Sequence, residues 1–288
     1  MLGRVLTLLI LTFTFASAGK ASSASEKALA LVKTNAYQDG PNCFNTSLLS
    51  LGYTHTQIYA SATEVEYYLK YHCQEVSLNL KKLEPSSLLT YSEDGLLIHT
   101  AVAINTNEIL EKNSLYGSKH KEVFGDPAPG KYLLHSVKKS IFFSQLGKKE
   151  NARAKAYRCE PSAQVLARQT EFESDDSIRR LKKFLTSLGE LQKIQNKTEL
   201  TKKMNTQLLQ KFKSLRISEA LESSSPSAQK ELYRLSLAES LAYQWNLLNC
   251  SDAYAKYDEC YAPEMQLSID TLEAFYPQIF RLREKLQP

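Results

Sequence analysis

The hydrophobic positions of the chain follow two different spacings, and the change from one to the other lies near residues 145 to 172. Beyond this region, apolar residues return every three or four positions, which is the spacing that lines one face of a helix. This spacing predicts four amphipathic helices, two on each side of a serine-rich break at 223–227, through the following apolar residues: Ile178, Leu181, Leu185, Leu188, Leu191 and Ile194; Leu200, Met204, Leu208, Phe212 and Leu215; Leu232, Leu235, Leu241, Trp245 and Leu248; Met265, Ile269, Leu272, Phe275 and Ile279.

Before the change in spacing, glycines and prolines separate short runs that are typical of strands. Residues 97–104, 107–113 and 130–137 are three such runs. The first part of the chain therefore reads as α+β, and the second part as all-helical. The predicted organisation is an α+β domain over 19–150 followed by a helical accessory domain over 151–288.

A short helix is predicted within the α+β part, directly after Pro41. Asn42 is a good N-cap, and Phe44, Leu48 and Leu51 then share one helical face. Gly52 supplies a common C-terminal stop. Cys43 therefore lies in the first turn of this helix.

The first 18 residues are typical of a secretory signal peptide, with Arg4, an uncharged apolar run from 5 to 15 and the small residues Ala16, Ser17 and Ala18. The apolar run is well short of the roughly 20 residues that a membrane-spanning helix requires. We expect an exported protein, secreted or periplasmic, with no stable membrane span. The formal net charge of +5 is small for 288 residues and argues against a nucleic-acid partner.

The chain has five cysteines, and an odd number cannot pair completely in an oxidising compartment. Cys250 and Cys260 flank a short connection and are candidates for one disulfide, while Cys73 and Cys159 are candidates for a second. With both formed, Cys43 is the free thiol. A zinc site is the weaker alternative, because His72 and Cys73 are adjacent but no second pair at ligand spacing accompanies them, so we expect neither a metal nor a cofactor.

Cys43 is also placed for nucleophilic chemistry. The unpaired N–H groups and the positive end of the dipole at a helix N-terminus favour a thiolate over a thiol. The same N–H groups, at Cys43 and beside Asn42, could receive the oxyanion of an attacked carbonyl. The competing interpretation is a structural cysteine that forms half of a disulfide.

A thiolate nucleophile needs a base, and His99 is the candidate among five histidines. It opens an alternating run in which the small residues Ala101 and Ala103 share its face, which indicates a site rather than a packed core. The competing interpretation is a hydrogen-bonded core histidine. The other histidines are His55, His72, His120 and His135.

A third residue that orients the imidazole is predicted on the next strand. If 105–107 forms a three-residue hairpin loop, with Asn107 in the left-handed conformation, Asn113 lies opposite His99 and Glu111 lies on the same face. Glu111 could also stabilise an imidazolium charge, whereas Asn113 could offer only a hydrogen bond.

These residues resemble the NlpC-type cell-wall peptidases and the related CHAP amidases, which share a papain-like fold and the order Cys, His, polar residue. The resemblance covers roughly residues 37 to 137, in "NCFNTSLLSLGY", "LEPSSLLTYS" and "HTAVAINTNEILEK". It implies Cys43 as nucleophile, His99 as base and Glu111 as orienting residue, with the acidic third residue closer to the CHAP side.

The sequence therefore leads to the hypothesis of an exported cysteine peptidase or amidase that acts on a peptide or cell-wall substrate. The helical part would narrow the cleft or dock the enzyme on a target or protein partner. The rival from another class is a secreted binding or structural module that keeps a papain-like fold without the chemistry.

Overall fold

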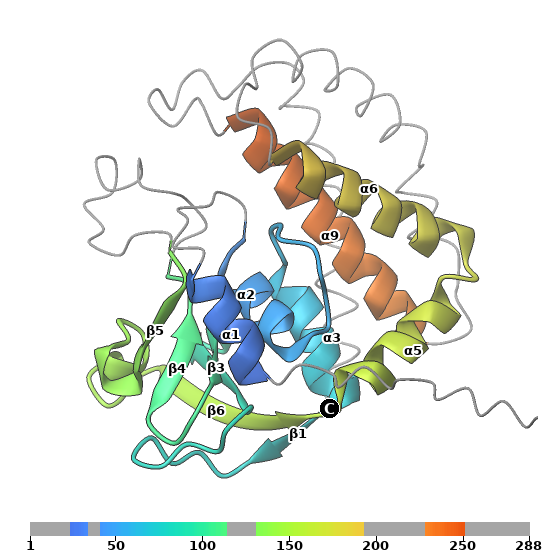
Figure 1. Ribbon diagram of the computed structural model, residues 1–288. Helices are drawn as coiled ribbons and strands as arrows, with labels where there is room; N and C mark the ends of the chain where they lie inside the picture. The colour runs from blue at the N-terminus through green and yellow to red at the C-terminus, as the bar shows by residue number, and fades with distance from the viewer. Residues whose placement is uncertain (1–23, 34–40, 114–130, 193–227, 251–288) are drawn as a thin grey trace, which may run out of the picture.

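Residues 24–33, 41–113, 131–192 and 228–250 are described by the computed structural model, in which helices pack on an antiparallel sheet (Figure 1). The sheet has six strands in the order β1-β6-β2-β3-β4-β5. Their bounds are Cys73–Val76 for β1, Leu88–Glu93 for β2, Leu96–Ala103 for β3, Glu108–Glu111 for β4, Leu133–Ser136 for β5 and Ala152–Cys159 for β6. The expectation of an α+β fold is confirmed.

The strands predicted over 97–104, 107–113 and 130–137 correspond to β3, β4 and β5. An Asp-Gly pair joins β2 to β3, and both Asp94 and Gly95 have positive φ angles, at 52° and 79°. Two-residue hairpins require such angles at both central positions, which Gly adopts freely and Asp tolerates. Strands β2, β3 and β4 thus form an antiparallel meander, and its central strand, β3, carries the candidate histidine.

Four residues separate β3 from β4, and the backbone N–H of Ile104 donates to the carbonyl of Glu108 at 2.9 Å, which leaves 105–107 as the predicted loop. Asn107 is not in the left-handed region, which contradicts that detail of the prediction. Asn105 replaces it as the residue that closes the loop. Its Oδ1 accepts hydrogen bonds from the backbone N–H groups of Asn107 and Glu108, each at 2.9 Å. An asparagine side chain that captures nearby backbone donors in this way mimics a backbone turn.

Six α-helices lie in the described part of the chain, and two short 3₁₀ turns follow β5. The helices are α1 (Ala24–Lys33), α2 (Cys43–Leu51), α3 (Ala62–His72), α5 (Ser162–Phe172), α6 (Asp176–Gln192) and α9 (Ala228–Cys250), and the turns are η2 (Val137–Lys139) and η3 (Phe143–Gln145). None of the described helices is both long enough and apolar enough to cross a membrane.

Helix α2 forms where the sequence predicts it and ends as predicted. The side chain of Asn42 accepts the backbone N–H of Asn45 at 3.1 Å, and Gly52 takes a left-handed φ of 80° at the C-terminus. These two residues satisfy backbone groups that a helix end leaves without an internal partner.

The two faces of the sheet carry separate hydrophobic cores. On one face, Leu88, Val102 and Leu110 pack with helices α1, α2 and α3. On the other face, Leu89, Ala101 and Ile109 pack with a cover that includes Val137 and Phe143. Alternation of side chains along each strand separates the two groups.

The helices α6 and α9 lie side by side and continue the first core rather than forming a separate one (Figure 1). Ser61, at the start of α3, donates its backbone N–H to Ser240 of α9 at 3.0 Å, and the Ser240 hydroxyl donates to Glu64 at 2.7 Å. Strand β6 lies beyond residue 150, so the sheet extends past the predicted domain boundary. The division into two domains stays a prediction, and the helices predicted around 200–215 and 263–279 fall outside the described residues.

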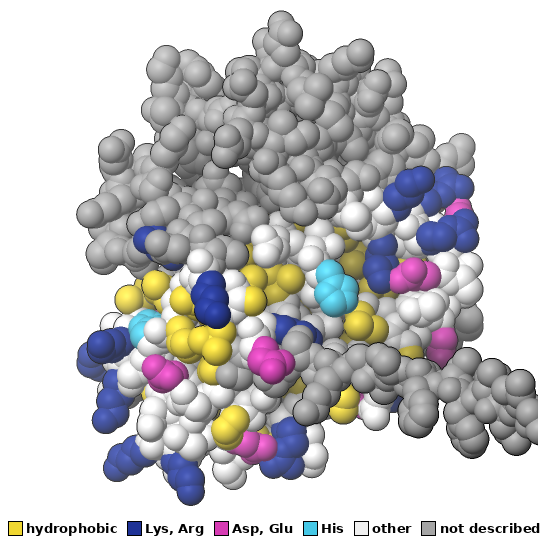
Figure 2. All heavy atoms as spheres, in the orientation of Figure 1, with side chains coloured by type: hydrophobic (Ala, Val, Ile, Leu, Met, Phe, Trp, Pro, Cys, Tyr) yellow, Lys and Arg dark blue, Asp and Glu magenta, His cyan; other side chains and the backbone are white. Residues whose placement is uncertain are grey.

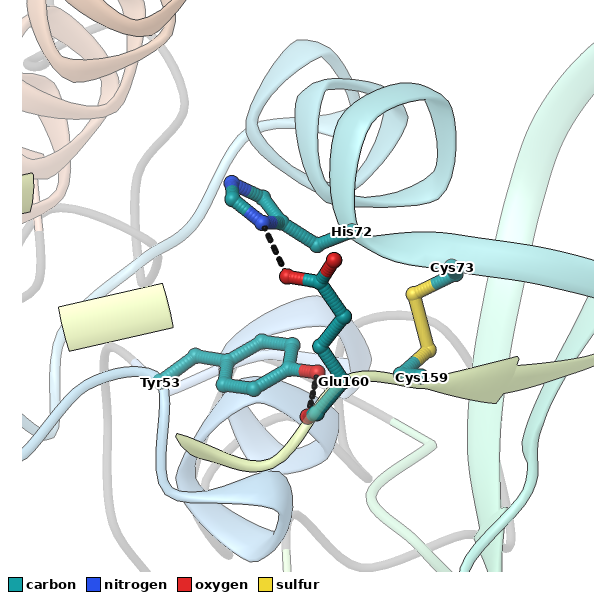
Figure 3. Close-up of a disulfide and its surroundings, with 5 residues drawn as sticks. All are labelled: Tyr53, His72, Cys73, Cys159 and Glu160. Carbon is teal, nitrogen blue, oxygen red and sulfur yellow. Dashed lines mark hydrogen bonds and ion pairs between the residues drawn. A yellow bond between two sulfur atoms is a disulfide. The ribbon is translucent and has the colours of Figure 1, made fainter. Parts of the chain in front are cut away.

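A disulfide joins Cys73 of β1 to Cys159 of β6, which confirms one predicted pair (Figure 3). The two cysteines are direct partners in the strand pairing. The thiol of Cys43 is free. The pairing of Cys250 with Cys260 cannot be compared with the structure, because Cys260 falls outside the described residues.

Surface charges of both signs are interleaved on the face drawn in Figure 2. Around the sheet, three described basic side chains pair with nearby acids: Lys149 with Glu93, Lys155 with Glu75 and Arg158 with Glu84, at 2.7, 2.8 and 2.6 Å. Exposed pairs of this kind contribute little to stability, typically about 0–1 kcal/mol each.

Candidate active site

The free thiol belongs to the first residue of α2, and two neighbouring groups fix the tip of this helix. The side chain of Asn42 donates to the carbonyl of Ala60 at 2.8 Å and accepts its backbone N–H at 3.2 Å. The Thr100 hydroxyl on β3 donates to the Cys43 carbonyl at 3.1 Å. Asn42 therefore holds the tip of α2, and Cys43, which is half-buried, is held beside β3.

His99 lies on β3 and is buried, with a side-chain exposure of 1%. Its Nε2 lies 2.9 Å from Oε2 of Glu111, and the Cys43 side chain is close enough to raise the pKa of the imidazole. The structure thus brings together the three side chains that the sequence analysis selected, from α2, β3 and β4.

The protonated form of His99 is favoured by its surroundings. Burial acts most strongly and lowers its pKa, but the charge and hydrogen bond of Cys43 and then those of Glu111 outweigh it. The result is a pKa raised from 6.5 to about 9. At neutral pH the imidazole is therefore protonated on both nitrogens, with the Glu111 carboxylate and the Cys43 sulfur as its neighbours.

A β-bulge directly before His99 sets the direction of its side chain. Tyr91 pairs with His99 and Ser92 pairs with Leu97, so Ile98 is an extra residue on β3. Leu97 packs toward the helices, whereas His99 contacts aromatic rings on the opposite face of the sheet. Bulges often re-aim a side chain next to a site. The sequence analysis missed this bulge, although the exposed Ile98 interrupts the alternation.

The predicted register between β3 and β4 is the observed one. Val102 pairs with Leu110 and Ala103 pairs with Ile109, which sets Glu111 on the face of His99. Glu111 is the residue that binds the imidazole. The alternative orienting residue, Asn113, does not, and its buried Oδ1 has no hydrogen-bond partner in the described part of the chain.

Glu111 is fully buried and accepts three hydrogen bonds. Besides His99, the donors are Nε2 of His135 at 2.8 Å and the hydroxyl of Ser140 at 2.9 Å. Burial raises the pKa of Glu111, but the hydrogen bonds of His135 and His99 and their charges outweigh it and lower this pKa from 4.5 to about 2. The carboxylate is therefore ionised at neutral pH.

An aromatic side chain covers the imidazole. The ring of Phe142 stacks on the ring of His99 with 3.9 Å between centroids and 14° between planes, and Phe143 contacts His99 edge-on. Sequence reasoning missed Phe142, His135 and Ser140. His135 could have been found, because it lies in the predicted strand 130–137, which is the next strand along the chain after the one that carries Glu111.

The remaining predicted residues lie away from this cluster. Cys73 and Cys159 are consumed in the disulfide, so neither is a zinc ligand. Beside them, His72 contacts Glu160 at 3.0 Å (Figure 3). The other ring nitrogen of His72 lies 3.0 Å from the Tyr67 hydroxyl. Among the described residues, no three His, Cys, Asp or Glu side chains are placed to hold a metal ion.

No protein-family model, curated protein or solved structure matches the chain. A thiol near a protonated imidazole, which in turn bonds an ionised carboxylate, can generate a nucleophile and deliver a proton to a leaving group.

Proposed function

We propose that the protein is an exported cysteine hydrolase that cleaves an amide bond through a thioester acyl-enzyme. The observation that carries this proposal is the His99 imidazole, which bonds Glu111 at 2.9 Å and has its pKa raised by the nearby free thiol of Cys43. Cys43 and Glu111 lie 56 and 12 positions from His99 in the sequence, yet both side chains meet at its imidazole. A thiolate nucleophile requires this arrangement of a base and an orienting group.

In the proposed starting state the thiol of Cys43 has given its proton to His99, so that a thiolate faces an imidazolium. The sulfur attacks the carbonyl carbon of the substrate amide, and the carbonyl electrons move to oxygen, where the N–H groups at the tip of α2 stabilise the negative charge. As the carbon–nitrogen bond breaks, the His99 imidazolium gives its proton to the leaving amine. The product of this half-reaction is a thioester on Cys43.

Water then releases the acyl group. The neutral imidazole of His99 takes a proton from water, and the hydroxide oxygen attacks the thioester carbon. The carbon–sulfur bond breaks, the carboxylic acid leaves, and the sulfur and imidazole return to their starting state. Glu111 does not exchange a proton in this scheme, because it orients the ring and stabilises its charge.

The substrate class follows from the resemblance to NlpC-type peptidases and CHAP amidases. A helix that carries the cysteine, followed by an antiparallel sheet that carries the histidine and the acid, is the order of elements in the papain-like fold. A peptide amide in a peptidoglycan stem or crosslink is the corresponding substrate. Export is supported by the predicted signal peptide and by the disulfide.

A thiol-reactive probe on the folded, non-reduced protein tests the proposal. Rapid stoichiometric labelling at Cys43, its loss in Cys43→Ser and hydrolysis of muropeptides by the wild type but not by Cys43→Ser are the expected results. An unreactive Cys43 would contradict the enzyme and favour the secreted binding module. Labelling that is unchanged in His99→Ala would show that the thiol is free but not paired with this imidazole.

A further inference from the structure

The groups that hold the His99–Glu111 pair come from one continuous stretch of the chain. Strand β5 lies along β4 at the edge of the sheet, and η2 and η3 follow it directly (Figure 1). His135 is on β5, Ser140 follows η2, and Phe142 precedes η3. We call residues 135–142 the clamp segment.

The clamp segment leaves the Glu111 carboxylate little freedom to turn. Oε2 accepts from both His99 and Ser140, and Oε1 accepts from His135. Both oxygens are therefore occupied, and the carboxylate is fully buried. Rotation of the carboxylate would break at least one bond to a buried acceptor, which is costly because no water replaces it.

The same segment acts on the imidazole itself. Phe142 lies parallel to the ring of His99, and the Ser140 hydroxyl also accepts the backbone N–H groups of Phe142 and Phe143, each at 3.3 Å. Ser140 thus connects the carboxylate to the residue that covers the ring. Any displacement of Ser140 would move both partners of His99 together.

We propose that His135, with Ser140 and Phe142, is a positioning residue of the site: it locks Glu111 so that the His99 ring keeps one orientation toward Cys43. For catalysis this inference rests on the proposed function, but the fixed imidazole is a physical property of the folded chain. His135 donates one hydrogen bond to Glu111, and its side chain is 19% exposed. A substitution of His135 therefore removes a bond to the buried carboxylate without replacing a fully buried side chain.

Matched substitutions of His135 test the inference in the full-length mature chain. His135→Gln keeps an N–H donor at the position of Nε2, whereas His135→Leu removes the donor and leaves Oε1 of Glu111 without a partner. The readout is the Nε2–H proton of His99 in an imidazole-labelled NMR spectrum, identified by its absence in His99→Gln. A purely structural role for His135 would leave this signal unchanged in any folded variant.

The wild type and His135→Gln should both give one slowly exchanging His99 signal. In His135→Leu the exchange of this proton with water should be at least about tenfold faster, because a hydrogen bond to a charged group is lost from the carboxylate that holds it. Equal exchange in His135→Leu and the wild type would overturn the inference. If His135→Leu does not fold, Ser140→Ala with Ser140→Thr as its control gives the same test.

The labelling rate of Cys43 separates this inference from the proposed function. A protected His99 proton that depends on His135, together with a Cys43 that does not react, would retain the clamp segment and reject the enzyme. A reactive Cys43 that depends on His99 but not on His135 would retain the enzyme and reject the clamp segment.

Discussion

Two buried histidines in this protein each contact a glutamate, and they differ in what lies on the other side of the ring. His99 meets Glu111 at 2.9 Å and His72 meets Glu160 at 3.0 Å. The second nitrogen of His72 lies 3.0 Å from the Tyr67 hydroxyl, whereas His99 lies near the free thiol of Cys43, which raises the pKa of its imidazole. A histidine–glutamate pair alone is therefore no sign of chemistry.

The surroundings of the two pairs explain their different roles. His72 ends α3, its backbone carbonyl accepts the N–H of Glu160 at 2.8 Å, and the adjacent Cys73 is closed in a disulfide (Figure 3). This pair joins the sheet to the helices. The other pair has a free thiol beside it and a carboxylate held by three donors, which is the arrangement that the proposed proton transfer requires.

The largest expected effect separates the two histidines. His99→Ala should lower the rate of Cys43 alkylation at pH 7 by about 100- to 10,000-fold, the range for loss of a general base. His72→Ala should leave this rate nearly unchanged and lower the melting temperature instead, because it leaves Glu160 and Tyr67 without a buried partner. Alkylation followed by mass spectrometry and thermal denaturation measure the two effects. Equal loss of alkylation in both variants would remove the distinction.

The disulfide beside His72 should affect stability without affecting the thiol. Replacing Cys73 and Cys159 together by Ala should lower the free energy of unfolding by about 2–5 kcal/mol, since the bridge restrains a long loop of the unfolded chain. Denaturant titration measures this loss. The alkylation rate of Cys43 in the folded variant should match the wild type, and a large fall would connect the two regions.

The two glutamates offer a smaller contrast. Glu111→Gln keeps the shape of the side chain but removes the charge that favours the His99 imidazolium, and we expect a roughly 10- to 100-fold lower alkylation rate, as for a weakened hydrogen bond to a charged group. Glu160→Gln is the matched control and should leave the rate close to that of the wild type. The same fall in both variants would indicate a general loss of structure.

The smallest effect is the pH dependence of stability. The pKa of Glu111 is lowered from 4.5 to about 2, so its contribution is present above pH 4.5 and is lost as the pH falls through 2. The pKa of His99 is raised from 6.5 to about 9, so its contribution is present below pH 6.5 and is lost as the pH rises through 9. The free energy of unfolding, measured by urea titration at several pH values, should fall at both acidic and alkaline pH. In Glu111→Gln the fall at acidic pH should be absent.

Local features of the site could be predicted from the sequence. Asn42 and Gly52 define the ends of α2 through their own side chain and backbone conformation, and the three-residue loop sets the register that places Glu111 beside His99. These features depend on residues close together in the sequence. The pairing of Cys73 with Cys159 was one of three pairings that four cysteines allow, and the structure rather than the sequence selects it.

The parts that could not be predicted depend on distant contacts. The bulge at Ile98 exists because β2 and β3 pair with an extra residue, and the short run around it contains no glycine or proline signal. Phe142 and Ser140 reach the site only because β5 pairs with β4 and the chain then turns back over His99. Strand β6 was missed because its partners, β1 and β2, lie far back in the sequence.

The central claim is that Cys43 and His99 act on each other, and the titration of the His99 imidazole by NMR tests it most directly. In the wild type, His99 should keep its proton until about pH 9, because the charge and hydrogen bond of Cys43 are the largest of the effects that raise its pKa. In Cys43→Ser, the proton should leave at a clearly lower pH. The same titration curve in both proteins would contradict the account.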